Sequence, residues 1–533
     1  MLESSYWAAT ALELVREDTV GAMLRRAAEQ APDERALVEG VPDPAKRRSW
    51  TYAGLLAEAE EAARALLGRF EPGERVAVWA NNIPEWVLLE MAVALAGLTL
   101  VTVNPAFREA EVRHVLRQSR AAGIFSLRDY RGNPMVETLA RIRPELPDLR
   151  EIVLFDDWAV FLASGSPGRP LPEVAAADPA QIQYTSGTTG APKGAVLRHR
   201  GITNSGRLSY ARVVGLRRGE VMVNAMPLFH TSGCVLSTLS TIAALGTQVL
   251  LPAFDPGAFL ALIESERSVA LTGVPTMLLA MLAHENFADT DLSSLRCAIS
   301  GGSTVPPDLV RRIEAGLGVP VTIIYGQTEA SPGITMTRLD DGPDDRAHTL
   351  GRPLPGVEVK IADPVRPERV VPVGEVGELC TRGYHVMAGY FDAPEQTAET
   401  VDAQGWLHTG DLASIDARGY CRIEGRVKDM IIRGWENIYP REIEQVLLEH
   451  PRVLDVAVVG VPDEYWGERV AAFVRPAPGD PPTEAALHDY ARLHLAPHKT
   501  PRSWHFVDEF PLTGSGKIQK FVLRERLLRR NPG

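Results

Sequence analysis

A repeated strand–helix–strand pattern sets the fold class of this chain. Residues 75–79 (Arg-Val-Ala-Val-Trp) form a short apolar run, residues 84–96 have helical character, and residues 98–103 form a second apolar run. Two strands joined by a helix are the parallel unit of α/β folds. The pattern therefore predicts an α/β protein built on parallel sheet.

The same pattern returns along most of the chain. Residues 19–68 are predicted as two helices around a turn, with Ser49 or Thr51 capping the helix 52–67. The α/β pattern continues to about residue 330, and short strands among Pro and Gly between 340 and 400 indicate mixed or antiparallel sheet. Further elements are expected as strands at 151–155, 221–225, 295–299 and 319–325, and as helices at 233–245 and 306–315.

A chain of 533 residues is too long for one hydrophobic core, so at least two domains are expected. A further unit starts near residue 428, after the charged stretch Gly425–Asp429, which suits a linker or hinge. We predict a domain of residues 1–427 and a smaller one of residues 428–533. The smaller unit should contain helices at 442–449 and 483–493, strands at 453–459 and 469–475, and a basic helical tail at 517–530.

The composition is that of a globular protein, with 45% hydrophobic and 23% charged residues. A net charge of −12 argues against a general nucleic-acid binder but leaves room for a local phosphate pocket. Four widely spaced cysteines without a CxxC pattern predict neither a zinc site nor a disulfide framework, and they fit the cytoplasm. No signal peptide is expected, and residues 233–252 are predicted as a buried helix and strand rather than a membrane span.

The segment Tyr184–Gly194 (Tyr-Thr-Ser-Gly-Thr-Thr-Gly-Ala-Pro-Lys-Gly) combines glycines, hydroxyl side chains and one lysine. Glycines let backbone N–H groups approach a ligand, hydroxyls add donors and Lys193 adds positive charge, which is the chemistry of a phosphate cradle. It is not a Walker A loop, because Pro192 stands where the second glycine would be. Alone, such a run is more often a solvated loop.

Two further polar segments follow predicted strands. Ser300-Gly-Gly-Ser303 lies between a strand and a helix, where backbone can approach a flat ligand; a plain turn is at least as common there. Tyr325-Gly-Gln-Thr-Glu329 also ends a strand, and it offers an aromatic ring, a hydroxyl and a carboxylate suited to Mg²⁺. The carboxyl ends of parallel strands are where α/β proteins bind ligands.

Three segments in the last third of the chain complete the set. Trp406-Leu-His-Thr-Gly-Asp411 places a carboxylate in a turn, where it suits the two hydroxyls of a ribose, although turn aspartates are common without a ligand. Gly425-Arg-Val-Lys-Asp429 marks the boundary of the second unit. Thr513-Gly-Ser-Gly-Lys517 places one lysine on a glycine-rich loop that can swing into a site.

The order and spacing of these segments resemble those of the adenylate-forming enzymes, from about residue 20 to residue 525. This superfamily includes acyl-CoA synthetases, peptide-synthetase adenylation domains and beetle luciferase. The resemblance implies a large N-terminal domain of parallel α/β subdomains plus a distorted β-barrel, and a small mobile α+β C-terminal domain. It also implies a cytoplasmic ligase that uses ATP and Mg²⁺ to convert a carboxylic acid into an acyl-adenylate, from which a nucleophile displaces AMP.

The resemblance also implies a role for each matching residue. The cradle closes over the β- and γ-phosphates, Glu329 helps to hold Mg²⁺ and Thr328 binds the α-phosphate. Lys517 reaches the carboxylate and α-phosphate oxygens, Lys428 is the hinge, and His230 borders the acyl pocket. The remaining nucleotide-binding positions are Thr185, Ser186, Gly187, Thr188, Thr189, Gly190 and Lys193 in the cradle, Gly301, Gly302, Ser303, Tyr325, Gly326 and Gln327 near adenine, and Asp411 and Arg426 at the ribose.

One position departs from the family pattern. Similar acyl-CoA synthetases read Gly-Gly-Glu-Asn where this chain reads Gly434-Trp435-Glu-Asn. The second small residue lines the tunnel for the pantetheine arm of CoA, and an indole adds about 150–250 Å² of surface. An obstructed tunnel favours an amino acid amine as acceptor, as in the coronafacic acid ligases, which this chain also resembles. If the indole turns outward, the acceptor is CoA.

Two other classes share parts of this pattern. A non-catalytic ATP sensor has no need of both Glu329 and Lys517, and a luciferase-type oxygenase would share the adenylation step and emit light. The acid itself is expected to be small to medium and hydrophobic. The chain continues for 16 residues beyond Lys517, so we expect a stand-alone enzyme without a carrier domain.

Overall fold

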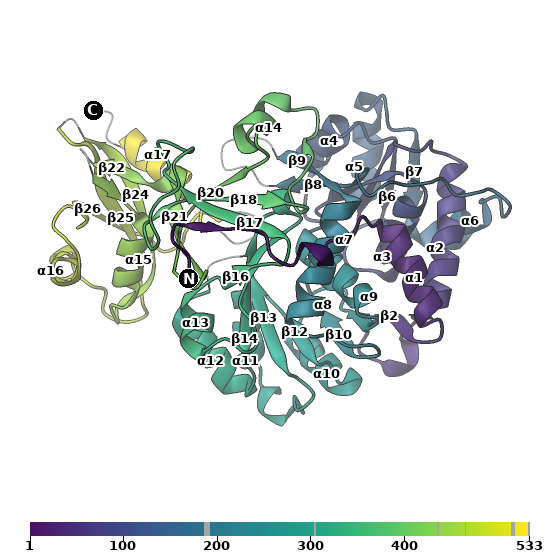
Figure 1. The fold of residues 1–533 in the computed structure, drawn as a ribbon, viewed down its shortest axis with the longest axis horizontal. Helices are drawn as coiled ribbons and strands as arrows, with labels where there is room; N and C mark the ends of the chain where they lie inside the picture. The colour runs from purple at the N-terminus through teal and green to yellow at the C-terminus, as the bar shows by residue number, and fades with distance from the viewer. Residues whose placement is uncertain (186–191, 303–304, 434–435, 464, 513–517, 531–533) are drawn as a thin grey trace.

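The computed structural model describes residues 1–185, 192–302, 305–433, 436–463, 465–512 and 518–530. The larger part of the chain contains two mainly parallel sheets with helices and one antiparallel sheet. A separate C-terminal unit follows and lies at one end of the molecule (Figure 1). The predicted α/β class is therefore confirmed. Within the described residues, no helix combines the length and the apolar character needed to cross a bilayer.

A seven-stranded sheet forms the first layer. Five of its strands run parallel, and β9 and β19 extend one edge antiparallel. In order across the sheet these strands are β19 (Gly389–Tyr390), β9 (Lys193–Arg198), β8 (Pro179–Thr185), β5 (Thr99–Val103), β4 (Arg75–Trp79), β6 (Gly123–Ser126) and β7 (Glu151–Leu154). The helices of this part are α1 (Val20–Gln30), α2 (Tyr52–Leu67), α3 (Pro84–Leu95), α4 (Glu109–Gln118), α5 (Met135–Ile142) and α6 (Trp158–Ala163).

Local signals explain where these helices begin. The Thr51 hydroxyl accepts a hydrogen bond from the Gly54 amide at 3.1 Å and caps α2, and Pro84 opens α3 at a position that needs no amide donor. The sequence predicted both helices. It missed a hairpin between α1 and α2, whose two strands join the second sheet instead of forming a simple turn.

The second layer is a nine-stranded sheet. Six strands are parallel, and the hairpin strand β3 and the strands β15 and β16 add antiparallel edges. In order they are β16 (Arg352–Pro353), β15 (Gly333–Met336), β14 (Val321–Gly326), β13 (Cys297–Gly301), β12 (Ala270–Thr272), β10 (Val221–Asn224), β11 (Thr247–Leu250), β2 (Arg35–Glu39) and β3 (Ser49–Thr51). Its helices are α7 (His199–Leu208), α8 (Tyr210–Val213), α9 (Ser240–Ala243), α10 (Pro256–Glu266), α11 (Pro275–Leu282), α12 (Pro307–Leu317) and α13 (Pro343–His348).

The helix predicted at 233–245 is present but wider than expected. Residues Ser232–Leu239 form a π-helix, η5, before α9 continues. The hydroxyls of Ser237 and Thr238 both bond to carbonyls five residues earlier, at 3.1 Å in each case. Such wide turns are rare and concentrate near functional sites.

A five-stranded antiparallel sheet forms the third layer, where the β-barrel was expected. Its strand order is β1 (Tyr6–Trp7), β17 (Val357–Ala362), β18 (Gly377–Gly383), β20 (Leu407–Ile415) and β21 (Cys421–Arg426). The first residues of the chain thus pair with a strand some 350 positions later, Tyr6 opposite Lys360. The helix α14 (Pro394–Thr400) precedes β20.

The C-terminal unit follows a single 3-10 turn, η8 (Val427–Asp429), after β21. Its sheet contains β23 (Glu436–Ile438), β22 (Ile431–Arg433), β25 (Gly467–Pro476), β24 (Val453–Asp463) and β26 (Ser503–Phe506), and its helices are α15 (Pro440–Leu448), α16 (Glu484–His494) and α17 (Lys520–Arg530). Two apolar clusters lie within this unit, separate from the clusters of the larger part.

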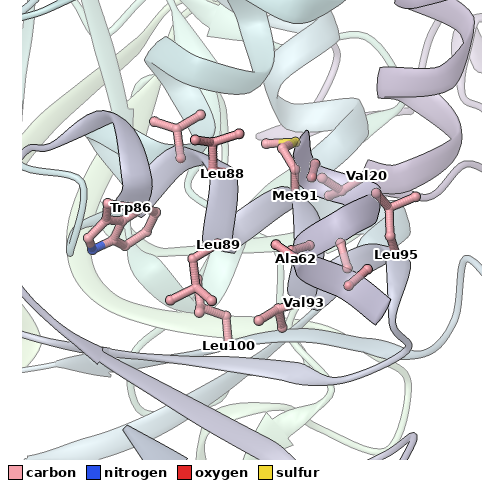
Figure 2. Packing of buried hydrophobic residues seen from close by; sticks show 14 of the residues in the cluster. Val20, Ala62, Trp86, Leu88, Leu89, Met91, Val93, Leu95 and Leu100 are labelled. Atoms are coloured by element: carbon pink, nitrogen blue, oxygen red, sulfur yellow. The ribbon is translucent and has the colours of Figure 1, made fainter. Parts of the chain in front are cut away.

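The largest apolar cluster surrounds α3, in which every residue except Glu85 is buried. Figure 2 shows Leu89 beside Leu100 and Val93, with Trp86 one turn away. A helix that is apolar on every side belongs in the interior of a large domain. The packing of α3 against α1, α2 and the seven-stranded sheet therefore anchors the N-terminal part of the molecule.

Replacing Leu89 by Ala should destabilise this part of the protein by about 2–5 kcal/mol, because it leaves a cavity among fully buried side chains. The measurement is the midpoint of chemical denaturation followed by tryptophan fluorescence. Val160→Ala is the control, because that side chain is 73% exposed and its removal should shift the midpoint little. Equal shifts for the two variants would contradict this description of the core.

Candidate active site

The predicted phosphate cradle connects two paired strands. Strands β8 and β9 run antiparallel, and Thr185 stands opposite Lys193 at the end where the loop joins them. The imidazole Nε2 of His114 lies 2.9 Å from the Pro192 carbonyl oxygen and fixes the returning end of the loop to α4. The cradle residues Ser186, Gly187, Thr188, Thr189 and Gly190 lie outside the described part of the chain.

Two glycine segments lie side by side at the carboxyl end of the nine-stranded sheet. Strands β13 and β14 are parallel neighbours, with Gly301 opposite Ile324. A Cβ atom on Gly301 would stand 2.5 Å from the Ile324 carbonyl oxygen, so only glycine allows this spacing. Gly302 has φ +76°, a conformation that also favours glycine. Ser303 is not among the described residues.

The segment after β14 turns sharply at its glycine. A Cβ atom on Gly326 would lie 1.6 Å from the Pro332 carbonyl oxygen, which no other residue type can accommodate. Gln327 is extended, and Thr328 then opens the 3-10 turn η7 (Thr328–Ala330), which also contains Glu329. This turn places a hydroxyl and a carboxylate next to each other just beyond the sheet.

Tyr390 connects the two large sheets at this point. Its hydroxyl donates to Glu329 Oε1 at 2.8 Å, and Lys193 Nζ lies 5.1 Å from the centre of its ring. Tyr390 belongs to β19, which pairs with β9, the strand that begins at Lys193. Sequence reasoning missed this residue, because a Gly-Tyr pair has no signature of its own; only the strand pairing brings it to Glu329.

The antiparallel sheet supplies a third set of groups. Asp411 on β20 accepts a hydrogen bond from the Tyr325 hydroxyl at 2.9 Å and pairs with Arg426 Nε at 2.9 Å. Burial, together with the negative charge of Asp411, raises the pKa of Tyr325 well above its usual value, so the phenol stays a donor. Tyr325, which the sequence analysis placed near adenine, thus forms one cluster with Asp411 and Arg426, which it placed together at the ribose.

Two other predicted residues flank this region. His230 is exposed, and its Nδ1 lies 3.1 Å from the Ser232 hydroxyl at the start of the π-helix. Lys428 lies in η8 with its side chain exposed, and partial desolvation together with the charge of Arg426 lowers the pKa of its ammonium group. Gly434, Trp435 and Lys517 lie outside the described residues, so their predicted roles stay predictions.

The described groups therefore converge from three sheets. They combine cations (Lys193, Arg426 and Lys428), carboxylates (Glu329 and Asp411) and glycine-lined backbone at the ends of β13 and β14. Cations and oriented donors suit phosphate groups, a carboxylate beside hydroxyls suits Mg²⁺, and a second carboxylate suits a diol.

The comparison with protein families agrees with this arrangement. The family model for AMP-binding enzymes matches residues 24–391, and the model for their C-terminal domain matches residues 442–517. The chain is an AMP-binding enzyme of the adenylate-forming superfamily. Its relatives place it in the acyl-CoA synthetase branch: the zebrafish (Danio rerio) protein named medium-chain acyl-CoA ligase ACSF2 is 37% identical over 98% of this chain and 91% of its own length.

Solved structures of related proteins share the fold. The ATP-bound structure of MatB from Rhodopseudomonas palustris is 30% identical, covers 96% of this chain and 99% of its own, and has a TM-score of 0.86. The amide bond synthetase McbA from Marinactinospora thermotolerans is also 30% identical. The match covers 95% of this chain and 99% of McbA, with a TM-score of 0.80. This AMP-binding enzyme is thus an ATP-dependent ligase that forms acyl-adenylates and uses ATP with Mg²⁺.

With Glu329 as the proposed Mg²⁺ ligand, the Tyr390→Phe variant should bind MgATP more weakly, because the Glu329 carboxylate loses the hydroxyl that orients it. The Mg²⁺ concentration that half-saturates ATP binding should rise about two- to tenfold, as expected for one hydrogen bond. This half-saturating Mg²⁺ concentration is measured by calorimetric titration with ATP at a series of Mg²⁺ concentrations. Tyr465→Phe is the matched control, since that ring is 82% exposed; a shift of the same size in both variants would contradict the role of Tyr390.

Proposed function

We propose that this enzyme activates a carboxylic acid as its adenylate and transfers the acyl group to the amine of an amino acid. The acyl-adenylate step belongs to the family, and the choice of acceptor rests on Trp435 in the sequence. In this proposal the Trp435 indole occupies the path that has to admit the thin pantetheine arm of CoA. Amines attack mixed anhydrides readily, so an obstructed path leaves an amine as the natural acceptor.

Each part of ATP has a proposed place among the candidate residues. We assign the β- and γ-phosphates to the cradle from Thr185 to Lys193, and the α-phosphate to Thr328. Mg²⁺ would be held by Glu329, a hard oxygen ligand that Tyr390 already orients. Adenine would lie against the glycines of β13, with Gly326 and Gln327 bounding it, while Asp411 would accept from the ribose hydroxyls and Arg426 would support it.

The reaction itself requires two anions to meet. The substrate carboxylate must attack the α-phosphorus, and positive charge has to offset the repulsion between them. We assign this role to Lys517. We also propose that the chain divides at residues 427 and 428, and that rotation about Lys428 withdraws Lys517 before the acyl transfer.

The acid is proposed to be small to medium and hydrophobic, and His230 to border its pocket. The name of the ACSF2 relative, a medium-chain acyl-CoA ligase, supports a chain of that size. All four cysteines are buried and free, which supports a reducing cytoplasm as the location.

A second candidate is an acyl-CoA synthetase that forms a thioester with CoA. The specific observation in its favour is that ACSF2, which the chain matches over nearly its full length, has this activity in its name. The amide bond synthetase McbA, with the same fold, favours the first candidate. The two candidates share the adenylation step and differ only in the acceptor.

The adenylation step predicts acid-dependent exchange of labelled pyrophosphate into ATP. Lys517→Ala should lower this exchange about 10²- to 10³-fold, because a charge that stabilises the transition state is lost. Lys499→Ala is the control, since Lys499 pairs with Glu442 at 2.7 Å within the C-terminal unit and should not affect exchange. Pyrophosphate exchange at the wild-type rate in Lys517→Ala would show that this lysine does not take part in adenylation.

The acceptor is decided by one competition assay in which CoA and a panel of amino acids are offered together and products are identified by mass. The wild-type enzyme should form amide and little acyl-CoA. Trp435→Gly should open the path and raise thioester formation while pyrophosphate exchange stays unchanged. Trp466→Gly removes an indole that lies against Arg433 and serves as the control. Efficient acyl-CoA formation by the wild type, with no gain in Trp435→Gly, would establish the second candidate.

A further inference from the structure

The Thr-Gly-Asp segment that contains Asp411 is a bulge in the antiparallel sheet. Strand β20 pairs with β18 as His408 opposite Cys380, and the pairing resumes as Leu412 opposite Glu378. Leu379 alone therefore stands opposite the three residues 409–411, and Gly410 has φ +69°. A bulge of this kind interrupts the ladder and turns a side chain in a new direction.

The Glu378 side chain fills the gap that the bulge creates. Its Oε1 accepts a hydrogen bond from the Gly410 amide at 3.0 Å, which replaces the missing ladder bond. The Thr409 hydroxyl secures the other side of the bulge, because it donates to the Leu379 carbonyl at 2.6 Å and accepts from the Asp411 amide at 3.1 Å. The backbone on both sides of Gly410 is thus held in place.

The second oxygen of Glu378 is held as well. Its Oε2 lies 2.8 Å from His408 Nδ1, and the other ring nitrogen of His408 lies 3.7 Å from an Asp402 oxygen. The hydrogen bond that His408 donates to Glu378 raises the pKa of His408, which favours an imidazolium paired with two carboxylates. The Glu378 side chain is only 12% exposed, so it has little freedom to leave the Gly410 amide.

A metal site is the other interpretation of this cluster. The Cys380 sulfur lies 3.5 Å from His408 Nδ1, and the ligand atoms of Glu378, Cys380 and His408 lie within 4.8 Å of one another. Burial raises the pKa of the Cys380 thiol, which keeps it protonated. The positive charge of buried Lys360 lies close enough to His408 to oppose a further cation there, and Glu378 already accepts a hydrogen bond from the Gly410 amide. These facts favour a role for Glu378 in positioning the backbone at Gly410 over a role as a metal ligand.

We propose that Glu378 is a positioning residue for nucleotide recognition: through the Gly410 amide it shapes the bulge that aims Asp411 at the ribose of ATP. This inference rests on the proposed assignment of Asp411 to the ribose. Asp411 meets Tyr325 and Arg426 at 2.9 Å each, so a small change in the bulge separates its carboxylate from both. Glu378 would act through the Gly410 amide rather than by touching the nucleotide.

The test compares ATP with 2′,3′-dideoxy-ATP in acid-dependent pyrophosphate exchange. The wild-type enzyme should prefer ATP, because the analogue lacks the hydroxyls that Asp411 accepts. Glu378→Asp keeps the charge but shortens the side chain, so the ratio of kcat/KM between the two nucleotides should fall about tenfold. Glu378→Gln keeps one carbonyl oxygen at the right length, and its ratio should stay near that of the wild type.

Glu358→Gln is the matched control, because this carboxylate pairs with Arg382 in the same sheet and does not touch the bulge. A role in stability alone would lower exchange with both nucleotides and leave their ratio unchanged; that result in a folded Glu378→Asp variant would overturn the inference. A wild-type enzyme that exchanges but shows no preference would refute it too, along with the ribose assignment. Absence of acid-dependent exchange would instead refute the proposed function.

Discussion

The hydrogen bond from Tyr325 to Asp411 joins the nine-stranded sheet to the antiparallel sheet, and the nucleotide site depends on that connection. A second bond, from Tyr390 to Glu329, joins the seven-stranded sheet to the same segment. Each phenol reaches a carboxylate in a partly dry environment, where an unpaired charge would be costly. The three sheets are therefore joined at the point where the described groups of the candidate site converge.

The balance of charge in the site follows from its task. Adenylation brings a carboxylate to a triphosphate, so cations must outnumber free anions near the reacting atoms. Both acidic groups of the described site already have partners: Asp411 pairs with Arg426, and Glu329 accepts from Tyr390. Their negative charge is thus directed to the ribose and to Mg²⁺ in the proposed arrangement, while the Lys193 ammonium group lies over the ring of Tyr390.

Much of the fold was predictable because its signals are local. Apolar runs and caps placed α2, α3 and the parallel strands close to their observed bounds. The sequence missed two features, one with a tertiary cause and one with a local cause. The hairpin of β2 and β3 lies in the sequence between two helices. Its strands extend a sheet whose neighbouring strand, β11, comes about 200 residues later in the chain. The π-helix η5 depends on Ser and Thr hydroxyls bonding five residues back, a pattern that helical periodicity cannot distinguish.

The sequence by itself determined the family and the acyl-adenylate chemistry, and it singled out the candidate site residues, because short segments carry the residue types that suit phosphate, metal and ribose. It also singled out Trp435, whose size bears on the acceptor. Only the tertiary structure brought Tyr390 to Glu329 and Glu378 to Gly410. Both contacts join residues separated by tens of positions, and they exist only because strand pairing and a bulge place them together.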